Sequence, residues 1–580
     1  MQDHVLLSGD PINVRFQVQA NLNFRPCQAF RWNVMESFPS RSSRSSLTGW
    51  LLFLGVSAGF ALLYVQAPLF YSNQFQYFLH GLADAGWGQL RDDWLARTTD
   101  PTPMFSRLVA LSASVFPVAI FQVYHASLLG LYALSVLGVF IYLGGSEFSW
   151  SRGLVFLAFV GMLHSGMIRW LSYQTLGFDY PWFLQAGLAG QYILGGFLQP
   201  SMFGVLLLVA VWQFLSDRPA MAGLSVGLAA LMHSTYLLPG ALMMLGFLAC
   251  LGIEKRWRDC LICGGLALLF VMFPIAYILR EFSPTSPELF AESQRLLVHV
   301  RIPHHCRVDL WLDWVAGLQI AWMLLAVALT KGTRLFLPLA IPLILGGLLT
   351  LLQVWSQSDT LALLFPWRVS SVLVPLSTAV ILSRLINILP LGNGTSLPIG
   401  MAFLTLVILM GCGIWIRGTG RAFHSAEEDR SLVAFVKEHH QPGEVYGIPV
   451  RIPNLVASTR GSLSSDYKPA PVKRKDGRLI PVDLQGFRLQ TGAPLFVDFK
   501  SIPYRDTDVV EWHRRLLLAN QMQELLQKKM AVQALALMEG EDLTHVVTPV
   551  QVEVNHDRLV PIFSDESYRL YQIRSETGRP

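Results

Sequence analysis

Long apolar runs constrain the fold of this chain more than any other feature. They follow one another from about residue 47 to residue 416, and most are long enough for a helix to cross roughly 30 Å of hydrocarbon. The sequence therefore predicts an α-helical polytopic membrane bundle. About eleven spans are expected, near residues 48–68, 118–143, 153–168, 199–216, 220–236, 237–253, 260–279, 310–329, 335–352, 366–388 and 399–416. A half-buried or interfacial helix is expected over Met104–Phe116.

The composition separates three regions. The whole chain is 52% hydrophobic and 14% charged, whereas soluble domains carry about a quarter charged residues. Residues 1–46 form a polar tail whose true start is either Met1 or Met35, and residues 47–417 form the membrane module. Residues 418–580 read as a soluble domain, without cysteine and dense in charge. The net charge of +5 fits positively charged inner loops and requires no nucleic-acid partner.

The C-terminal region carries mixed helix and strand patterns that predict a small α/β domain. Ser425–Glu428 has the pattern of a capping box and predicts a helix to about Glu438. A second helix is expected from Asp506 into the Leu516–Met538 region. Strands are expected at Val445–Val450, Pro494–Phe499, His545–Val550 and Tyr568–Ile573. Phe487–Tyr504 alternates apolar and charged residues, which favours a strand with one packed and one polar side.

The distribution of basic residues predicts the orientation in the membrane. A cytoplasmic N-terminus places most basic loop residues inside: Arg41, Arg44, Arg152, Arg218, Lys255, Arg256, Arg258, Lys331, Arg334 and Arg384. An odd number of spans then places the loop at 70–104 and the whole C-terminal domain outside the cytoplasm.

The polar stretch Tyr71–Pro103 between the first two spans predicts a folded loop with a site. Connections this long are usually functional or linkers, and a linker would lack aromatic residues such as Trp87 and Trp94. The stretch also carries the carboxylate pair Asp92 and Asp93.

Further ionisable residues gather at the predicted outer ends of the spans, where they are functional candidates by default. Together with Lys500 of the C-terminal domain they are expected to bind substrate: His164, Arg169, His233, Arg301, His304, His305 and Arg368. Several of them also have a simpler interpretation. His164 and His233 could be hydrogen-bonded core histidines, and Arg368 could extend to the interface. Either aspartate could cap a loop helix, and Lys500 could belong to an ordinary surface strand.

Taken together, these groups suit transfer chemistry. A carboxylate can deprotonate an acceptor hydroxyl, and Asp93 is the first candidate for this base, followed by Asp92. Arginines can stabilise a departing phosphate. The paired carboxylates would also suit Mg²⁺ or Mn²⁺, although no cofactor can be assigned from the sequence. Cys260 and Cys263 have metal or redox spacing but open an apolar span and lack a second ligand pair, so core packing is expected.

This pattern resembles the GT-C superfamily of integral-membrane glycosyltransferases. The resemblance covers about residues 47–580 and includes the segments LGGFLQPSMFG (194–204), LMHSTYLLPG (231–240), HVRIPHH (299–305) and FRLQTGAPLFVDFKSIPY (487–504). It implies a polyprenyl-phosphate sugar donor, a long first outer loop with an acidic motif and an extracytoplasmic C-terminal domain. The chain departs from the superfamily at Asn73-Gln74, two amides where many members carry an acidic residue.

Two functions remain open from the sequence. The first is transfer of a sugar from a polyprenyl-phosphate donor to an unknown acceptor at the extracytoplasmic face, with Asp92 or Asp93 in place of the early acidic residue. The second is a non-catalytic membrane protein of the same fold, acting in transport, assembly or binding. Both place the chain in the lipid bilayer.

Overall fold

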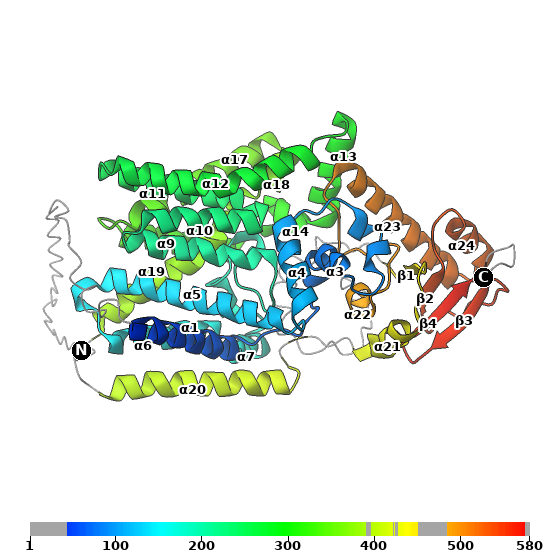
Figure 1. The fold of residues 1–580 in the computed structure, drawn as a ribbon, viewed down its shortest axis with the longest axis horizontal. Coiled ribbons are helices and arrows are strands. Elements are labelled where there is room, and N and C mark those ends of the chain that lie inside the picture. The colour runs from blue at the N-terminus through cyan, green and yellow to red at the C-terminus, as the bar shows by residue number, and fades with distance from the viewer. Residues whose placement is uncertain (1–42, 390–395, 422, 424–426, 451–483, 575–580) are drawn as a thin grey trace, which may run out of the picture. The chain divides into compact units, whose positions relative to one another are not determined.

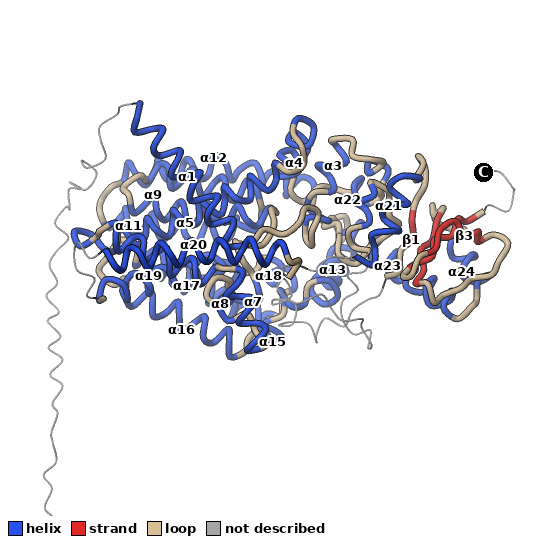
Figure 2. The backbone as a smooth tube through the Cα atoms, turned by 90° about the horizontal axis from the view of Figure 1, so that it is seen from below, coloured by secondary structure: helices blue, strands red, loops and turns tan. Residues whose placement is uncertain are grey.

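The computed structural model describes residues 43–389, 396–421, 423, 427–450 and 484–574. Helices dominate up to residue 418 (Figure 1). Figure 2 shows the strands grouped together near the C-terminal end of the chain. The expected fold class, a helical polytopic bundle followed by a small α/β part, is confirmed.

Each of the eleven predicted spans contains a helix. In the described residues, seven helical segments are long and apolar enough to cross a membrane, and a pair bent by 47° adds an eighth. The long segments contain α1 (Ser43–Tyr64), α5 (Ile120–Gly144), α11 (Leu237–Ile253), α12 (Trp257–Glu281), α17 (Phe336–Ser356), α19 (Ser370–Ile388) and α20 (Ser396–Gly418). The bent pair is α6 (Trp150–His164) and α7 (Gly166–Leu176). The remaining three predicted spans are shorter apolar helices: α9 (Val205–Leu215, preceded by the 3₁₀ turn Pro200–Gly204), α10 (Pro219–Met232) and α16 (Trp314–Leu329).

Helix α16 illustrates how local chemistry sets a boundary. The predicted span begins near residue 310, but the helix begins at Trp314. The Asp313 carboxylate accepts hydrogen bonds from the backbone N–H groups of Val315 and Ala316, at 3.0 and 3.1 Å. This is an N-cap, which satisfies donors that the first helical turn leaves unpaired.

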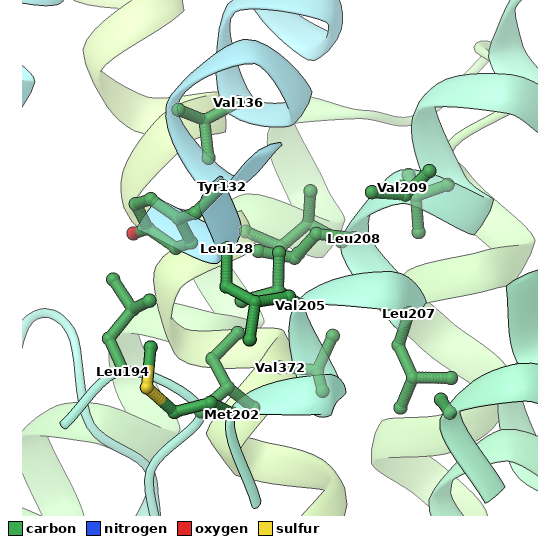
Figure 3. Packing of buried hydrophobic residues seen from close by; sticks show 14 of the residues in the cluster. Leu128, Tyr132, Val136, Leu194, Met202, Val205, Leu207, Leu208, Val209 and Val372 are labelled. Carbon is green, nitrogen blue, oxygen red and sulfur yellow. The ribbon is translucent and has the colours of Figure 1, made fainter. Parts of the chain in front are cut away.

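The bundle core is built from aliphatic side chains on helices distant in sequence. Figure 3 shows Leu128 and Tyr132 of α5 packed near Val205 and Leu208 of α9 and Val372 of α19. All five are buried. Where apolar surface is removed from water, burial stabilises the fold by about 25 cal/mol per Å². Where the helices are surrounded by lipid, close packing between them stabilises the bundle instead.

The segment between α1 and α5 is folded, as predicted. It contains α2 (Gln74–Tyr77), α3 (Leu79–Asp84), the 3₁₀ turns Leu90–Asp92 and Leu95–Arg97, and α4 (Pro103–Val115). Helix α4 corresponds to the helix expected over Met104–Phe116. The amides of Asn73 and Gln74 hold the segment in place, because they donate to Gln199 Oε1 and the Leu198 carbonyl at 3.0 and 3.1 Å.

Short helices connect the later spans and carry much of the site described below. They are α8 (Tyr180–Phe183), α13 (Pro287–Leu296), α14 (Pro303–Cys306), α15 (Val308–Trp311) and α18 (Asp359–Leu363). Cys260 and Cys263 are free thiols. The Cys263 sulfur lies 3.7 Å from the sulfur of Met244 in the buried core, consistent with the packing role expected for it.

The C-terminal part contains a four-stranded sheet in the order β1-β2-β4-β3. Its strands are β1 (Tyr446–Gly447), β2 (His545–Pro549), β3 (Leu559–Ser564) and β4 (Tyr568–Ile573), and its helices are α21 (Arg430–His439), α22 (Phe487–Thr491), α23 (Asp506–Gln527) and α24 (Ala531–Met538). Strand β1 runs parallel to β2, and β4 pairs antiparallel with both β2 and β3. The predicted strands at His545 and Tyr568 and the helix at Asp506 are confirmed, whereas the sequence prediction missed β3. The predicted capping box at Ser425 lies partly outside the described residues.

The strands predicted at Pro494–Phe499 and over Phe487–Tyr504 are wrong. Phe487–Tyr504 begins with the short helix α22 and continues as irregular chain, and Leu495 makes only a single parallel bridge to Tyr446. The alternation misled because the charged residues of the segment, Arg488 and Asp498, are themselves buried and paired with each other.

Candidate functional site

A buried ion-pair network joins the first loop to the segment Phe487–Tyr504. Arg488 Nε donates to Asp93 Oδ2 at 2.6 Å, and its Nη1 donates to Asp498. Arg488 and Asp498 are 2% and 4% exposed, and Asp93 is fully buried. Burial lowers the pKa of Arg488, but the carboxylates of Asp93 and Asp498 outweigh this effect and give a net rise. The guanidinium therefore remains charged between its two partners.

All hydrogen bonds of Asp93 go to its own protein. Oδ1 accepts from the backbone N–H groups of Leu95 and Ala96, at 2.9 and 3.3 Å. Oδ2 accepts from Arg488 and from the backbone N–H of Leu495, at 2.6 and 2.8 Å. A carboxylate engaged in this way caps a turn and fixes a domain contact. These contacts favour a structural role, and the role of catalytic base that the sequence predicted for Asp93 stays a prediction.

Asp92 occupies a different environment. Its side chain is 47% exposed and pairs with Arg97 at 2.8 Å. The two adjacent aspartates thus do not converge on one point, and they do not fit a shared Mg²⁺ or Mn²⁺ ion. In the part of the chain that the structure describes, no group of three or more His, Cys, Asp or Glu residues could hold a metal.

Backbone contacts tighten the same junction. Trp87 Nε1 donates to the Leu489 carbonyl at 3.0 Å, and Gln89 N donates to the Gly492 carbonyl at 2.7 Å. A Cβ atom on Gly88 would lie 2.6 Å from the Gly492 carbonyl oxygen. Both glycines also have positive φ, 54° and 76°. Only glycine permits this approach of two backbones.

A second group of side chains, which we call the arginine cluster, comprises Arg301, Arg368, His233, His304 and His305. Its members come from segments far apart in the chain, and the segments of both arginines depart from regular α-helix. Arg301 ends the π-helical turn Leu297–Arg301. Arg368 lies in the 3₁₀ turn Pro366–Val369, directly after Phe365 with φ of 49°. Irregular backbone of this kind is often found at functional sites.

Arg301 is only 8% exposed. Its Nη2 donates to the backbone carbonyl of Lys500, and its guanidinium carbon lies 5.2 Å from the Phe499 ring centroid. Its buried Nε has no hydrogen-bond partner among the described residues. The segment Phe487–Tyr504 therefore contacts the arginine cluster as well as Asp93.

Arg368 is likewise 8% exposed. Its Nη1 donates to Gln191 Oε1, and its guanidinium carbon lies 5.2 Å from the Tyr236 ring centroid. Its Nε, too, is buried without a partner in the described part of the chain. The simpler interpretation, in which Arg368 extends to the interface, does not agree with this burial.

Neither Arg301 nor Arg368 has a carboxylate within ion-pair distance among the residues that the structure describes. The other buried arginines do: Arg488 pairs with Asp93, and Arg169 pairs with Asp179 at 2.7 Å. A buried charge without a counter-charge is strongly unfavourable. Two such charges in one place favour an anionic ligand, and guanidinium groups match phosphate oxygens particularly well.

Burial favours the neutral form of His304 and His305. It lowers the pKa of His305 to about 4, with the positive charges of Arg368 and Arg301 adding to the effect. His305 Nδ1 is hydrogen-bonded to the Ala189 carbonyl at 2.7 Å. Burial also lowers the pKa of His304, and the charges of Arg301 and Lys500 lower it further. The Nδ1 atoms of His304 and His233 are buried without a hydrogen-bond partner in the described residues.

Two tyrosines that the sequence analysis did not select, Tyr77 and Tyr504, lie beside the arginine cluster. Burial raises the pKa of Tyr77, the neighbouring Tyr504 raises it further, and Arg368 and Arg301 oppose the rise. The Tyr77 ring lies 5.8 Å from the His233 ring. Tyr504 accepts a hydrogen bond from Gln76 at 3.2 Å. Neither tyrosine lies among the charged residues and histidines at the span ends, on which the sequence prediction was based. The position of Tyr504 at the end of the distinctive segment Phe487–Tyr504 could have indicated it.

Two predicted substrate ligands do not belong to this cluster. Both ring nitrogens of His164 are hydrogen-bonded within the bundle, to Tyr132 and to the Val160 carbonyl, at 2.9 and 2.8 Å. These contacts favour the simpler interpretation of His164 as a hydrogen-bonded core histidine. Arg169 is held by Asp179, and its guanidinium carbon lies 4.4 Å from the Trp182 ring centroid.

The helices and the C-terminal sheet define a multi-pass helical membrane protein with a small α/β part. The structure is similar to the crystal structure of ArnT from Cupriavidus metallidurans bound to undecaprenyl phosphate. The two chains are 11% identical, with a TM-score of 0.42, over 92% of this chain and 99% of that chain. The match does not bear on the substrate or the reaction of this chain.

A family model described as a domain of unknown function, DUF6798, matches residues 472–519. The part of this matched range that the structure describes includes Arg488, Asp498, Lys500 and Tyr504. The family match thus falls on the segment that contacts both the first loop and the arginine cluster. A search of curated proteins finds no match.

Proposed function

We propose that this chain is a membrane glycosyltransferase-like protein that binds a polyprenyl-phosphate sugar through Arg301 and Arg368. It transfers the sugar to an acceptor at the extracytoplasmic face, with the N-terminus in the cytoplasm and the C-terminal domain outside. The observation that carries the proposal is the burial of two guanidinium groups without a carboxylate partner among the described residues. A lipid phosphate supplies the missing charge, and the apolar helices of the bundle provide surface for its chain.

In this reaction the bond between the sugar and the phosphate oxygen breaks, and the acceptor oxygen forms the new bond to the sugar. Arg301 and Arg368 stabilise the negative charge that grows on the departing phosphate. The acceptor hydroxyl loses its proton to a base. Because Asp93 is engaged by four donors, we assign this role to a neutral imidazole of the arginine cluster, with the buried Nδ1 of His304 as the first candidate. A phosphate bound nearby raises the low pKa of that imidazole and makes it a better base.

The transfer reaction can be tested with labelled polyprenyl-phosphate sugars and purified protein in lipid nanodiscs. Release or transfer of the label is expected with wild-type protein, and Arg301→Ala or Arg368→Ala should each reduce turnover by roughly 10²–10³. Arg295→Ala is the matched control, because Arg295 lies on α13, is exposed and pairs with Glu292. Full activity of both cluster variants would place the site elsewhere.

A specific observation also favours the second function, a non-catalytic membrane protein of the same fold that acts in transport, assembly or binding. The buried carboxylates that join the first loop to the segment Phe487–Tyr504, Asp93 and Asp498, are both engaged with Arg488. If wild-type protein binds polyprenyl phosphate but turns over none of the donors tested, this second function is the correct one.

A further inference from the structure

A pocket lies beside the arginine cluster and is lined chiefly by aromatic and small residues. It is partly open to solvent, and its lining includes Trp182, Trp311, His304 and Gly190. His304 belongs to both the pocket and the cluster. The 3₁₀ turn Leu188–Gly190 forms part of the wall, and the next residue, Gln191, accepts a hydrogen bond from Arg368.

Two side chains of the pocket lining carry hydrogen-bond donors without a partner. The indole nitrogens of Trp182 and Trp311 are buried without a partner among the described residues, and the two side chains are only 3% and 7% exposed. An indole N–H can only donate a hydrogen bond. A buried donor without an acceptor is unfavourable, so a ligand that brings oxygen acceptors between aromatic rings is expected to fit this pocket.

We infer that this pocket binds the sugar of the donor, with the indole N–H groups of Trp182 and Trp311 donating to its hydroxyl oxygens. The inference rests on the proposed function, since a sugar attached to a phosphate at Arg301 and Arg368 lies one bond from that phosphate. An isoprenoid chain is the alternative occupant, but it has no atom that can accept a hydrogen bond from either indole.

Arg169, one of the expected substrate ligands, has a positioning role in this arrangement. Arg169 lies against the Trp182 ring and is itself fixed by Asp179, so it positions the indole and does not touch the sugar. The other indole is also held in place, because Trp311 packs against Trp367 with ring centroids 5.2 Å apart. Trp367 precedes Arg368, so the contact between Trp311 and Trp367 links the pocket to the segment that carries Arg368.

The test compares the binding of bare polyprenyl phosphate with that of polyprenyl phosphates carrying a hexose, a pentose or an amino sugar. The variant is Trp311→Phe, which keeps an aromatic ring and removes the N–H donor. Trp322→Phe is the control, because Trp322 lies on α16, donates to Thr378 at 3.0 Å and does not line the pocket. Thermal unfolding of each variant shows whether it has kept its fold.

Wild-type protein should prefer at least one sugar-bearing lipid over the bare lipid. Trp311→Phe should reduce that preference by roughly two- to tenfold, the effect of one hydrogen bond, while bare polyprenyl phosphate binds as before. Equal weakening of both ligands would show that the pocket holds the lipid chain, and an unchanged preference would also overturn the inference. Binding of the bare lipid without any preference for sugar would refute the sugar pocket alone. Failure of wild-type protein to bind any of these lipids would refute the proposed function as well.

Discussion

Asp92 and Asp93 are adjacent in the sequence and have different physical roles. Asp92 is half exposed and pairs with an exposed arginine, an arrangement worth about 0–1 kcal/mol. Asp93 is fully buried and accepts hydrogen bonds from Arg488 and three backbone N–H groups. The sequence shows the pair of carboxylates but not their environments, because burial depends on a segment almost four hundred residues away.

The first prediction separates the structural role of Asp93 from a catalytic one. Asp93→Asn removes the charge that balances buried Arg488, and loss of one partner of a buried pair typically costs about 3–5 kcal/mol. A clear drop in the thermal unfolding temperature in detergent is expected. Asp92→Asn, the adjacent control, should change stability by less than about 1 kcal/mol. If Asp93→Asn kept wild-type stability and lost only turnover, the sequence-based role as catalytic base would be right.

The second prediction concerns pH. The unfolded pKa of histidine is about 6.5, and burial lowers the folded pKa of His305 to about 4. The stability that depends on neutral His305 is therefore fully present above about pH 6.5 and is lost as the pH falls towards 4. His305→Asn can retain the N–H donor to the Ala189 carbonyl and does not titrate. Unfolding temperatures measured from pH 7.5 to pH 4.5 should fall less steeply for this variant, and identical slopes would contradict the assignment.

At the scale of elements, the sequence predicted those whose pattern is local. The apolar runs gave helices at every expected span, and Tyr71–Pro103 could be recognised as a folded connection from its aromatic residues. The segment Phe487–Tyr504 was misread because its charged residues Arg488 and Asp498 are buried, paired with each other and, through Arg488, with Asp93. The alternation of apolar and charged residues in this segment therefore did not correspond to one packed and one exposed face of a strand. Long-range pairing of this kind has no local signal in a single sequence.

A pair of glycines tests whether the contact between the first loop and this segment is required for stability. Gly88→Ala would bring a Cβ within 2.6 Å of the Gly492 backbone and would also strain a positive φ. A loss of about 2–5 kcal/mol is expected from the clash and the strain together. Gly86→Ala is the matched control, because it has a φ of 78° but nothing within 4 Å of the added Cβ. It should lose only about 1–2 kcal/mol. Equal unfolding temperatures for the two variants would show that the backbone contact is not close in solution.

At the scale of the whole molecule, the arginine cluster combines parts that are remote in sequence. Arg301 follows α13, Arg368 precedes α19, Tyr77 belongs to the first loop and Tyr504 to the C-terminal segment. Of the residues that the sequence predicted, His233, Arg301, His304, His305 and Arg368 come together, Lys500 lies beside them, and His164 and Arg169 do not join them. The convergence of basic groups was foreseeable from span ends. The sequence could not show which of these basic groups lack a carboxylate partner, because that depends on where every carboxylate lies in the fold.

The most direct measurement compares the binding of polyprenyl phosphate and polyprenol, the same lipid without the phosphate, to protein in nanodiscs. Wild-type protein should bind the phosphate more tightly, because Arg301 and Arg368 each contribute a charged hydrogen bond worth about 1.5–3 kcal/mol, or roughly tenfold or more in affinity. The double variant Arg301→Ala/Arg368→Ala should bind the two lipids equally, while Arg295→Ala should keep the wild-type preference. If the double variant still prefers the phosphate as strongly as wild-type protein does, the two buried arginines are not an anion site and the account is wrong.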